Sequence, residues 1–188
     1  VSFQACNAGG CTTEYLTVVL GTGITALAGL DQIICGGTIA TLAGNDPTPD
    51  AGLWTVLSGG GSVTTPTAFN SGVTGLSVGV NEFIWTITGT GCVSDDTVSI
   101  TIVTPPDAGL IGTHDFCVTD PAANLYSDLG GTPDLGGSWS TGPPALTGGD
   151  QGTFTPGVNI AGVYTYTVTG TAPCANALQT VTVTVVNA

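Results

Sequence analysis

Two pairs of cysteines recur in the chain at the same spacing. The interval from Cys35 to Cys92 equals that from Cys117 to Cys174, so both members of the second pair are displaced equally from the first. The flanking residues shift with them: "GNDPTPDAGLW" corresponds to "GGTPDLGGSW", and "FIWTITGTGC" to "YTYTVTGTAPC". A period of roughly 80 residues indicates a tandem repeat in which each unit has the size of a small domain.

Within each repeat, apolar and polar residues alternate over the stretches with clearest β character. Period-two alternation predicts strands with one face in a core and the other in water. The 30 Gly and 11 Pro predict many turns, and we find no stretch with helical periodicity. The predicted inward rows are Val98, Ile100 and Ile102; Tyr164, Tyr166 and Val168; and Val181, Val183 and Val185.

These patterns predict an all-β chain of tandem Ig-like β-sandwich domains with short linkers, each of about seven strands. Trp54 and Trp139 each follow the first cysteine of their repeat by about 20 residues, where an Ig-like sandwich buries a tryptophan. We expect repeat 1 over 27–106 and repeat 2 over 107–188. The stretch "TPPDAG" at 104–109 predicts a stiff linker, and "GTGITALAG" at 21–29 a more flexible one.

The opening stretch "VSFQACNAGGCTTEYLTVVL" aligns with 80–103 and 161–186, the closing hairpin of each repeat. We therefore expect residues 1–26 to hold the closing hairpin of an upstream Ig-like domain and a linker. A hairpin donated to a neighbouring molecule is the alternative, which we favour less because repeat 2 has a closing hairpin of its own.

Cysteine content predicts disulfides and hence an oxidising compartment. Equal spacing and strand ends expected at one pole of each sandwich favour Cys35–Cys92 and Cys117–Cys174, each worth roughly 4 kcal/mol in the chain-entropy model. In the first hairpin, Cys6 and Cys11 flank four residues, which favours a local bridge. The alternative pairs Cys11 with a cysteine of the upstream domain.

Charge excludes several classes of partner. The chain has 13 acidic residues, no Lys or Arg, and one His. Binding of nucleic acid or of an anionic lipid surface depends on cationic side chains, so neither is expected. No apolar run is long enough to span a bilayer, so we expect no direct membrane insertion. Because carboxylates repel one another and lack Lys or Arg partners, we expect mild acid not to unfold the chain.

Candidate catalytic and metal residues are few. His114, Asp115 and Cys117 are close in sequence, but the pattern favours a structural strand, so we expect no enzyme and no cofactor. Asn45, Asp46 and Asp50 share a loop, and Asp95 and Asp96 another. Oxygen-rich loops can bind Ca²⁺, which makes Asp46 and Asp50 calcium candidates, whereas turn formation explains the same residues without a metal.

Four stretches, "AGLDQIICGGTIATLAGN", "GLWTVLSGGG", "VTGLSVGVNEFIWTI" and "GVYTYTVTGTAPCANALQTVTVTV", resemble the Ig-like and PKD-like repeats of large Bacteroidota surface proteins. Gliding-motility adhesins and type IX secretion substrates contain such repeats, mostly as spacers. The resemblance also implies that Thr97, in "Asp-Thr-Val", is a candidate O-glycosylation site. Its predicted outward direction is compatible with a glycan.

The expected function is that of a structural stalk or spacer segment in a long extracellular surface filament or adhesin. Its partners would be neighbouring repeats of the same chain or filament. The alternative is a carbohydrate- or surface-binding module that uses loops at one pole of the sandwich. Exposed aromatic residues would favour this alternative, but only 6% of the chain is aromatic.

Overall fold

The structure is a computed structural model that describes residues 2–15, 23–140 and 144–187. Within these ranges the chain is all-β: strands β1 to β15 are accompanied by two single-turn 3-10 helices and no α-helix. No described helix has the length and apolar character to cross a bilayer. The fold class predicted from strand alternation is therefore confirmed.

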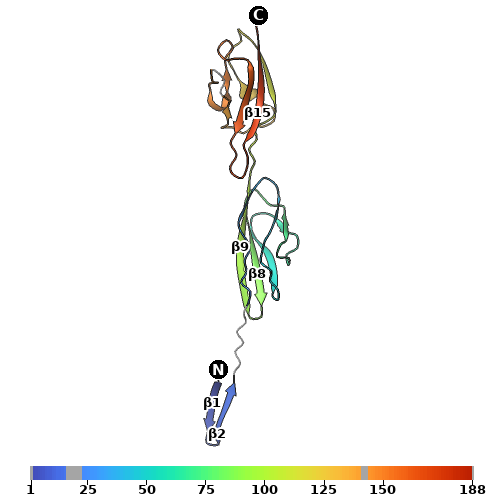
Figure 1. Ribbon diagram of the computed structural model, residues 1–188, viewed down its shortest axis with the longest axis vertical. Helices are drawn as coiled ribbons and strands as arrows, with labels where there is room; N and C mark the ends of the chain where they lie inside the picture. The colour runs from blue at the N-terminus through green and yellow to red at the C-terminus, as the bar shows by residue number, and fades with distance from the viewer. Residues whose placement is uncertain (1, 16–22, 141–143, 188) are drawn as a thin grey trace. The chain divides into compact units, whose positions relative to one another are not determined.

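The first element is a two-stranded antiparallel hairpin, seen in blue in Figure 1. It consists of β1 (Ser2–Asn7) and β2 (Gly10–Tyr15), with Cys6 directly opposite Cys11. In the turn, the Gly9 N–H donates to Asn7 Oδ1 at 2.9 Å. Residues 16–22, which hold the end of the predicted hairpin and the start of the predicted 21–29 linker, lie outside the described residues.

The strands β3 to β9 form what we call the first sandwich. One sheet has the order β3-β9-β8-β5, and the other β4-β7-β6, so the expected seven strands are present. The strand bounds are β3 (Gln32–Cys35), β4 (Ile39–Thr41), β5 (Ala51–Ser58), β6 (Ser62–Val63), β7 (Gly72–Thr74), β8 (Gly79–Gly89) and β9 (Cys92–Val103).

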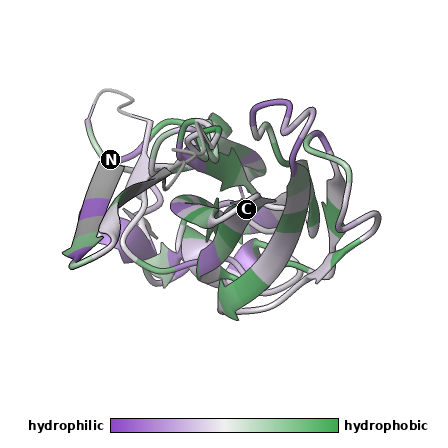
Figure 2. Ribbon diagram, turned by 90° about the horizontal axis from the view of Figure 1, so that it is seen from below, coloured by the Kyte–Doolittle hydropathy of each residue, from purple (hydrophilic) through white to green (hydrophobic). Residues whose placement is uncertain are grey.

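Alternating side chains of β8 and β9 fill the core of the first sandwich, as the sequence pattern predicts. Figure 2 shows hydrophobic and hydrophilic residues alternating along the strands. At the centre, the rings of Trp54 and Trp85 lie 4.9 Å apart, and both are fully buried. Other buried core residues are Leu42, Val73, Phe83, Ile87, Val98, Ile100 and Ile102.

The segment before β3 is held along β9 by side chains rather than by a backbone ladder. The Ala26 N–H donates to Ser94 Oγ at 3.0 Å, and the Ala28 N–H donates to Asp96 Oδ2 at 2.7 Å. Ala26 and Ala28 are buried. The described part of the predicted 21–29 linker is thus packed against the sandwich that follows it.

Strands β10 to β15 form the second sandwich, with sheets of order β10-β15-β14-β12 and β11-β13. The described part of this repeat therefore has six strands rather than the expected seven. Two 3-10 helices, η1 (Leu125–Asp128) and η2 (Gly149–Gln151), lie in its connections. The strand bounds are β10 (Gly112–Cys117), β11 (Ala123–Asn124), β12 (Ser138–Trp139), β13 (Thr153–Phe154), β14 (Gly162–Val168) and β15 (Ala177–Val186).

The core of the second sandwich is aromatic and contains hydroxyl groups. Phe116 stacks on Phe154 with ring centroids 4.9 Å apart, and Phe154 meets Tyr164 edge-on at 5.7 Å. The hydroxyl groups of Tyr164 and Tyr166 donate to the backbone oxygens of Ile160 (2.6 Å) and Asp134 (2.8 Å), so burial leaves neither hydroxyl without a partner.

In both sandwiches the first strand pairs in parallel with the last. Cys35, at the end of β3, lies opposite Val103, at the end of β9. Cys117, at the end of β10, lies opposite Val186, at the end of β15. The first and last strands therefore end at the same pole, and this arrangement determines which cysteines can meet.

The chain divides into two compact units. The first comprises Val1–Asp31, Ile39–Leu76 and Asn81–Ser99, and the second comprises Gln32–Thr38, Ser77–Val80 and Ile100–Ala188. Strand β3, the linker at 104–109 and the whole second sandwich thus belong to the second unit.

Candidate functional site

The disulfides differ from the predicted pairing. Cys35 is bonded to Cys174, with Cα atoms 4.9 Å apart, and Cys6 to Cys11. Cys92 and Cys117 are exposed thiols. The predictions of Cys35–Cys92 and Cys117–Cys174 are therefore wrong, whereas the local bridge in the first hairpin is present.

The parallel pairing of first and last strands explains the error. Cys35 lies beside the end of β9, whereas Cys92 begins the same strand, at its opposite end. At about 3.3 Å per residue these positions are roughly 36 Å apart, and a disulfide tolerates a Cα separation of only about 4.4–6.8 Å. Cys117 and Cys174 are separated along β15 in the same way.

Bonded Cys35 and Cys174 both lie in the second compact unit and close a loop with a sequence separation of 139. In the chain-entropy model a loop of that length stabilises the folded state by about 5 kcal/mol. The Cys174 side chain is buried, and the Gly36 N–H donates to the Val103 carbonyl oxygen at 2.8 Å beside the bond. The disulfide therefore lies at the start of the linker.

The carboxylate of Asp134 anchors the linker at 104–109. The Asp107 N–H donates to Asp134 Oδ2 at 2.9 Å, and the Asp134 N–H donates to the Asp107 carbonyl oxygen at 2.8 Å. Asp107 Oδ1 in turn accepts the Gly109 N–H at 2.7 Å. These reciprocal bonds hold the stretch that the two prolines predicted to be stiff.

The same anchor occurs in the first repeat. Asp50 ends a Thr-Pro-Asp triplet, as Asp134 does, and its Oδ2 accepts the Ile24 N–H at 3.2 Å. Ile24 lies just before the first sandwich, as Asp107 lies just before the second. This role was not predicted from the sequence, although the triplet occurs once in each repeat and could have revealed it.

The calcium candidates have structural partners. Asp46 Oδ1 accepts both the N–H and the hydroxyl of Thr48, at 2.9 and 2.7 Å, and these two hydrogen bonds, the hydroxyl first, lower the pKa of Asp46. Asn45 Oδ1 accepts the Leu27 N–H at 2.8 Å. No group of three metal-ligating side chains occurs in the described part of the chain. Asp46 thus takes part in a local turn, whereas Asn45 and Asp50 accept N–H groups of the segment that precedes the sandwich.

His114, Asp115 and Cys117 do not converge. His114 Nδ1 lies 2.9 Å from Asp128 Oδ2, and its ring stacks on Phe116 at 4.0 Å. Asp115 instead accepts a hydrogen bond from the Thr184 hydroxyl. Because Asp115 and Cys117 are on the exposed face and His114 is on the other, the three side chains cannot act on one substrate.

The remaining sequence-predicted residues are placed on their strands. Trp54 is a core residue, but Trp139 is only half-buried at the edge of its core and donates its indole N–H to the Asp150 carbonyl oxygen at 2.8 Å. Trp85 is fully buried and was missed. Thr97 is exposed on β9, which leaves its hydroxyl accessible.

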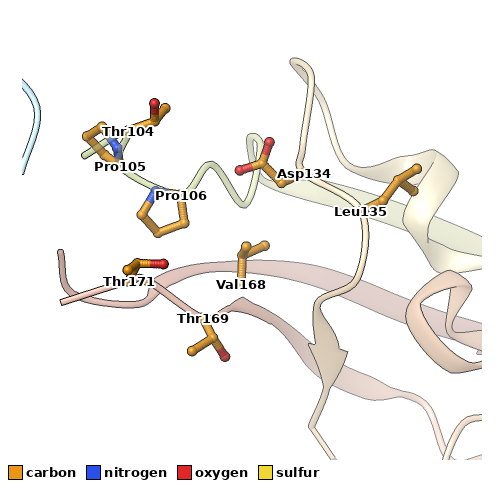
Figure 3. Close-up of a pocket in the computed structure, with 9 residues that line it drawn as sticks. Thr104, Pro105, Pro106, Asp134, Leu135, Val168, Thr169 and Thr171 are labelled. Carbon is orange, nitrogen blue, oxygen red and sulfur yellow. The ribbon is translucent and has the colours of Figure 1, made fainter. Parts of the chain in front are cut away.

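A groove of about 400 Å³ opens beside the linker, within the second unit. Figure 3 shows Val168 on the side of its strand that faces Pro106 and Asp134, with Thr169 on the opposite side. No aromatic residue lines it, and Asp134 contributes its one carboxylate. The lining residues are Thr104, Pro105, Pro106, Asp134, Leu135, Val168, Thr169, Gly170 and Thr171.

The groove offers hydroxyl and carboxylate groups that can hydrogen-bond to a polyol. Its lining holds a single carboxylate, whereas glycoside hydrolysis ordinarily uses a pair.

Comparison with known proteins gives the fold. No protein-family model matches the sequence, and no curated protein matches it. The insect immune protein hemolin aligns with 98% of this chain at 12% identity and a TM-score of 0.58. The hemolin structure is described as a domain arrangement with implications for homophilic adhesion. Extracellular domains 3–5 of Drosophila OTK align with 84% of it at 14% identity and a TM-score of 0.50.

This chain spans 55% of the hemolin chain and 59% of the OTK chain. At such low identity the likeness shows the fold alone, which is that of tandem Ig-like domains. The disulfides indicate an oxidising compartment, such as the extracellular space.

Proposed function

We propose that this chain is a structural segment of the stalk of a long extracellular surface filament or adhesin. The observation that carries the proposal is the Cys35–Cys174 disulfide. A load applied at the two ends passes from residue 35 to residue 174 through one covalent bond. The residues between these two cysteines are excluded from the load path.

The linker anchors support the same role. Asp50 and Asp134 each fix the segment that enters a sandwich. Hydrogen bonds from backbone N–H groups to a carboxylate are stronger than those between neutral groups. A spacer benefits from such a fixed entry because a floppy joint would let successive domains fold back.

The resemblance to repeats of Bacteroidota surface proteins supports a place among cell-surface adhesins or filaments. In that setting, neighbouring repeats of the same chain or filament are the partners. Neither nucleic acid nor an anionic lipid surface is a partner, because the chain has no Lys or Arg with which to bind an anionic surface.

The alternative, a carbohydrate- or surface-binding module, is favoured by the groove beside the linker. Hydroxyl groups of Thr104 and Thr171 line it together with the Asp134 carboxylate. A glycan array probed with the whole chain tests this alternative. Specific retention that is lost in Leu135→Ala, which removes an exposed lining side chain, would favour the binding module over the stalk.

Cyclic stretching of single molecules tests the stalk. The oxidised chain, held by its two ends, should gain length only from residues outside 36–173, which include strands β3 and β15, because residues 36–173 carry no load. Cys35→Ser should show unfolding steps and hysteresis at the same pulling rate. Cys92→Ser is the matched control and should behave like the parent chain. Hysteresis of equal size in the oxidised parent would contradict the proposal.

A further inference from the structure

Cys117 occupies the same local position in the second sandwich as Cys35 in the first. Each cysteine ends a first strand that pairs in parallel with the last strand. Beside Cys35, the Gly36 N–H donates to the Val103 carbonyl oxygen at 2.8 Å, and beside Cys117, the Val118 N–H donates to the Val186 carbonyl oxygen at 3.1 Å. The two backbones are therefore equivalent up to and beyond the cysteine.

The partner of Cys35 shows what such a position binds. Cys174 lies in the turn between β14 and β15 of the following repeat, and its equivalent in the first repeat is Cys92, into which the turn between β8 and β9 leads. The observed bond thus joins the first-strand cysteine of one repeat to the turn cysteine of the next. The two positions recur in the sequence repeat as Cys117 and Cys92, although Cys92 begins β9 and is exposed, whereas Cys174 precedes β15 and is buried.

Cys117 cannot reach the turn cysteine of its own sandwich. It lies opposite Val186, whereas Cys174 precedes the start of β15 at Ala177. The two ends of β15 are roughly 30 Å apart at about 3.3 Å per residue, far beyond the reach of a disulfide. Any partner that reproduces the Cys35 bond must come from a further repeat.

We propose that Cys117 forms an inter-repeat disulfide with the turn cysteine of another Ig-like repeat of this kind, in the head-to-tail sense of Cys35–Cys174. The exposed Cys117 thiol is accessible for it. The two thiols lose two protons and two electrons, and an external disulfide oxidant accepts them and is reduced to two thiols. This inference rests on the proposed stalk role and gives the stalk a covalent link at each joint.

A second copy of the chain provides the test, because its Cys92 aligns with Cys174 in the sequence repeat. The purified chain is transferred from reductant into a buffer of reduced and oxidised glutathione. Disulfide-linked oligomers should form, and peptide mapping without reduction should identify Cys117 bonded to Cys92 of another copy. Cys117→Ser alone and Cys92→Ser alone should each lose the disulfide-linked oligomers, and a mixture of the two should form heterodimers.

A displaced thiol controls for random collision. Cys117→Ser combined with Thr113→Cys keeps one exposed thiol on the same face of β10, away from the strand end, and should not give the oligomers. Cys117 that stays a thiol, a Cys117–Cys117 dimer, exchange onto Cys174, or equal cross-linking of the displaced thiol would each overturn the proposal. Because the stretching experiment uses single monomeric chains, the stalk role can fail or stand separately from this result.

Discussion

The two sandwiches place an aromatic pair at the same point of the core, but they use different chemistry. The first packs Trp54 against Trp85, with centroids 4.9 Å apart, and the second packs Trp139 against Tyr166, at 5.1 Å. The Trp85 indole N–H donates to Asn45 Oδ1 at 3.2 Å. Tyr166 uses its hydroxyl both as a donor to the Asp134 carbonyl oxygen and as an acceptor from the Gly137 N–H.

A glycine makes room for the second ring in both repeats. Gly52 and Gly137 each lie two residues before the tryptophan, and neither has a positive φ. A Cβ at Gly52 would overlap the Trp85 ring, and one at Gly137 would overlap the Tyr166 ring. Both repeats therefore place a glycine under a large ring. The ring is the indole of Trp85 in the first repeat and the ionisable phenol of Tyr166 in the second.

Alanine at these glycines should have the largest effect. Forcing atoms into a packed core costs typically about 1–3 kcal/mol, so we expect Gly52→Ala to lower the free energy of unfolding of the first sandwich by about 3 kcal/mol and Gly137→Ala that of the second by about 2 kcal/mol. The Trp85 ring also lies against Gly44, which leaves it little room to shift. The Tyr166 ring is instead positioned by a hydrogen bond to its hydroxyl. Urea titration followed by tryptophan fluorescence measures both.

Gly162→Ala is the matched control for both substitutions. Nothing lies within 4 Å of a Cβ at Gly162, which begins β14. It should change the free energy of unfolding by no more than about 0.5 kcal/mol, as ordinary surface substitutions do. Equal losses in all three variants would show that the rings do not require the glycines.

Alkaline pH should unfold the second sandwich before the first. Burial raises the pKa of Tyr164 and of Tyr166 above the ordinary value of about 10. The folded state then holds these protons more tightly, so stability is complete below about pH 10 and is lost as the pH rises through the folded pKa values. Each pKa unit corresponds to about 1.4 kcal/mol.

Melts from pH 8 to 11.5 check this difference. The chain has no Lys or Arg whose deprotonation would add to the effect, and the equivalent residues of the first sandwich, Phe83 and Trp85, do not ionise. Tyr164→Phe with Tyr166→Phe should reduce the alkaline loss, at a stability cost at neutral pH from the missing hydrogen bonds. Parallel loss of both sandwiches would contradict the assignment.

The linker anchors should differ in strength. Removing a hydrogen bond to a charged group costs about 1.5–3 kcal/mol in partly buried surroundings and less at a surface. We expect Asp134→Ala, whose bond is exposed, to destabilise the second sandwich by about 1 kcal/mol, and Asp50→Ala the first by more, about 1.5 kcal/mol, since its bond is partly buried although longer, 3.2 against 2.9 Å. Thermal unfolding measures both, and Asp95→Ala, at an exposed carboxylate of β9, is the control.

Acid should have the smallest effect, through Asp46 of the first sandwich. Hydrogen bonds from Thr48 lower the folded pKa of Asp46 below its ordinary 3.8. Its contribution is therefore complete above pH 3.8 and is lost as the pH falls through the folded pKa. The aligned stretch of the second repeat has glycine there. Asp46→Asn should flatten the acid limb of the melting curve of the first sandwich, and an unchanged limb would show that the contact carries no stability.

This effect runs against the expectation that repulsion among carboxylates dominates in acid. Backbone N–H groups take the place of the missing cations along the described chain. The aspartates that accept one are Asp31, Asp46, Asp50, Asp96, Asp107, Asp120, Asp134 and Asp150.

The sequence predicted the fold well because strand alternation reports burial directly. Val98, Ile100 and Ile102 alternate in sequence and are buried as expected. Disulfide pairing could not be predicted in the same way, because the cysteine spacing does not decide it. The equal spacing of the two cysteine pairs follows from the repeat itself, and it is equally compatible with pairing within a repeat and between repeats. Only the parallel register of β3 with β9 decides between them.

The structure of the linker at 104–109 could be predicted only in part. Two prolines indicated a stiff linker, but the bond between Asp107 and Asp134 depends on a loop that is distant in the sequence. Trp85 was missed although Phe83, Trp85 and Ile87 alternate in sequence as Tyr164, Tyr166 and Val168 do, and although its repeat partner Tyr166 was placed in the core.

The length released by reduction tests the central claim most directly. With Cys35 bonded to Cys174, a fully extended chain is shortened by their sequence separation of 139, roughly 480 Å at about 3.3–3.6 Å per residue. Single-molecule stretching before and after reductant should therefore differ by roughly 480 Å, apart from the small loop closed by Cys6 and Cys11. A gain of roughly 390 Å, as two loops closed within the repeats by Cys35–Cys92 and Cys117–Cys174 would give, or no gain at all, would contradict the account.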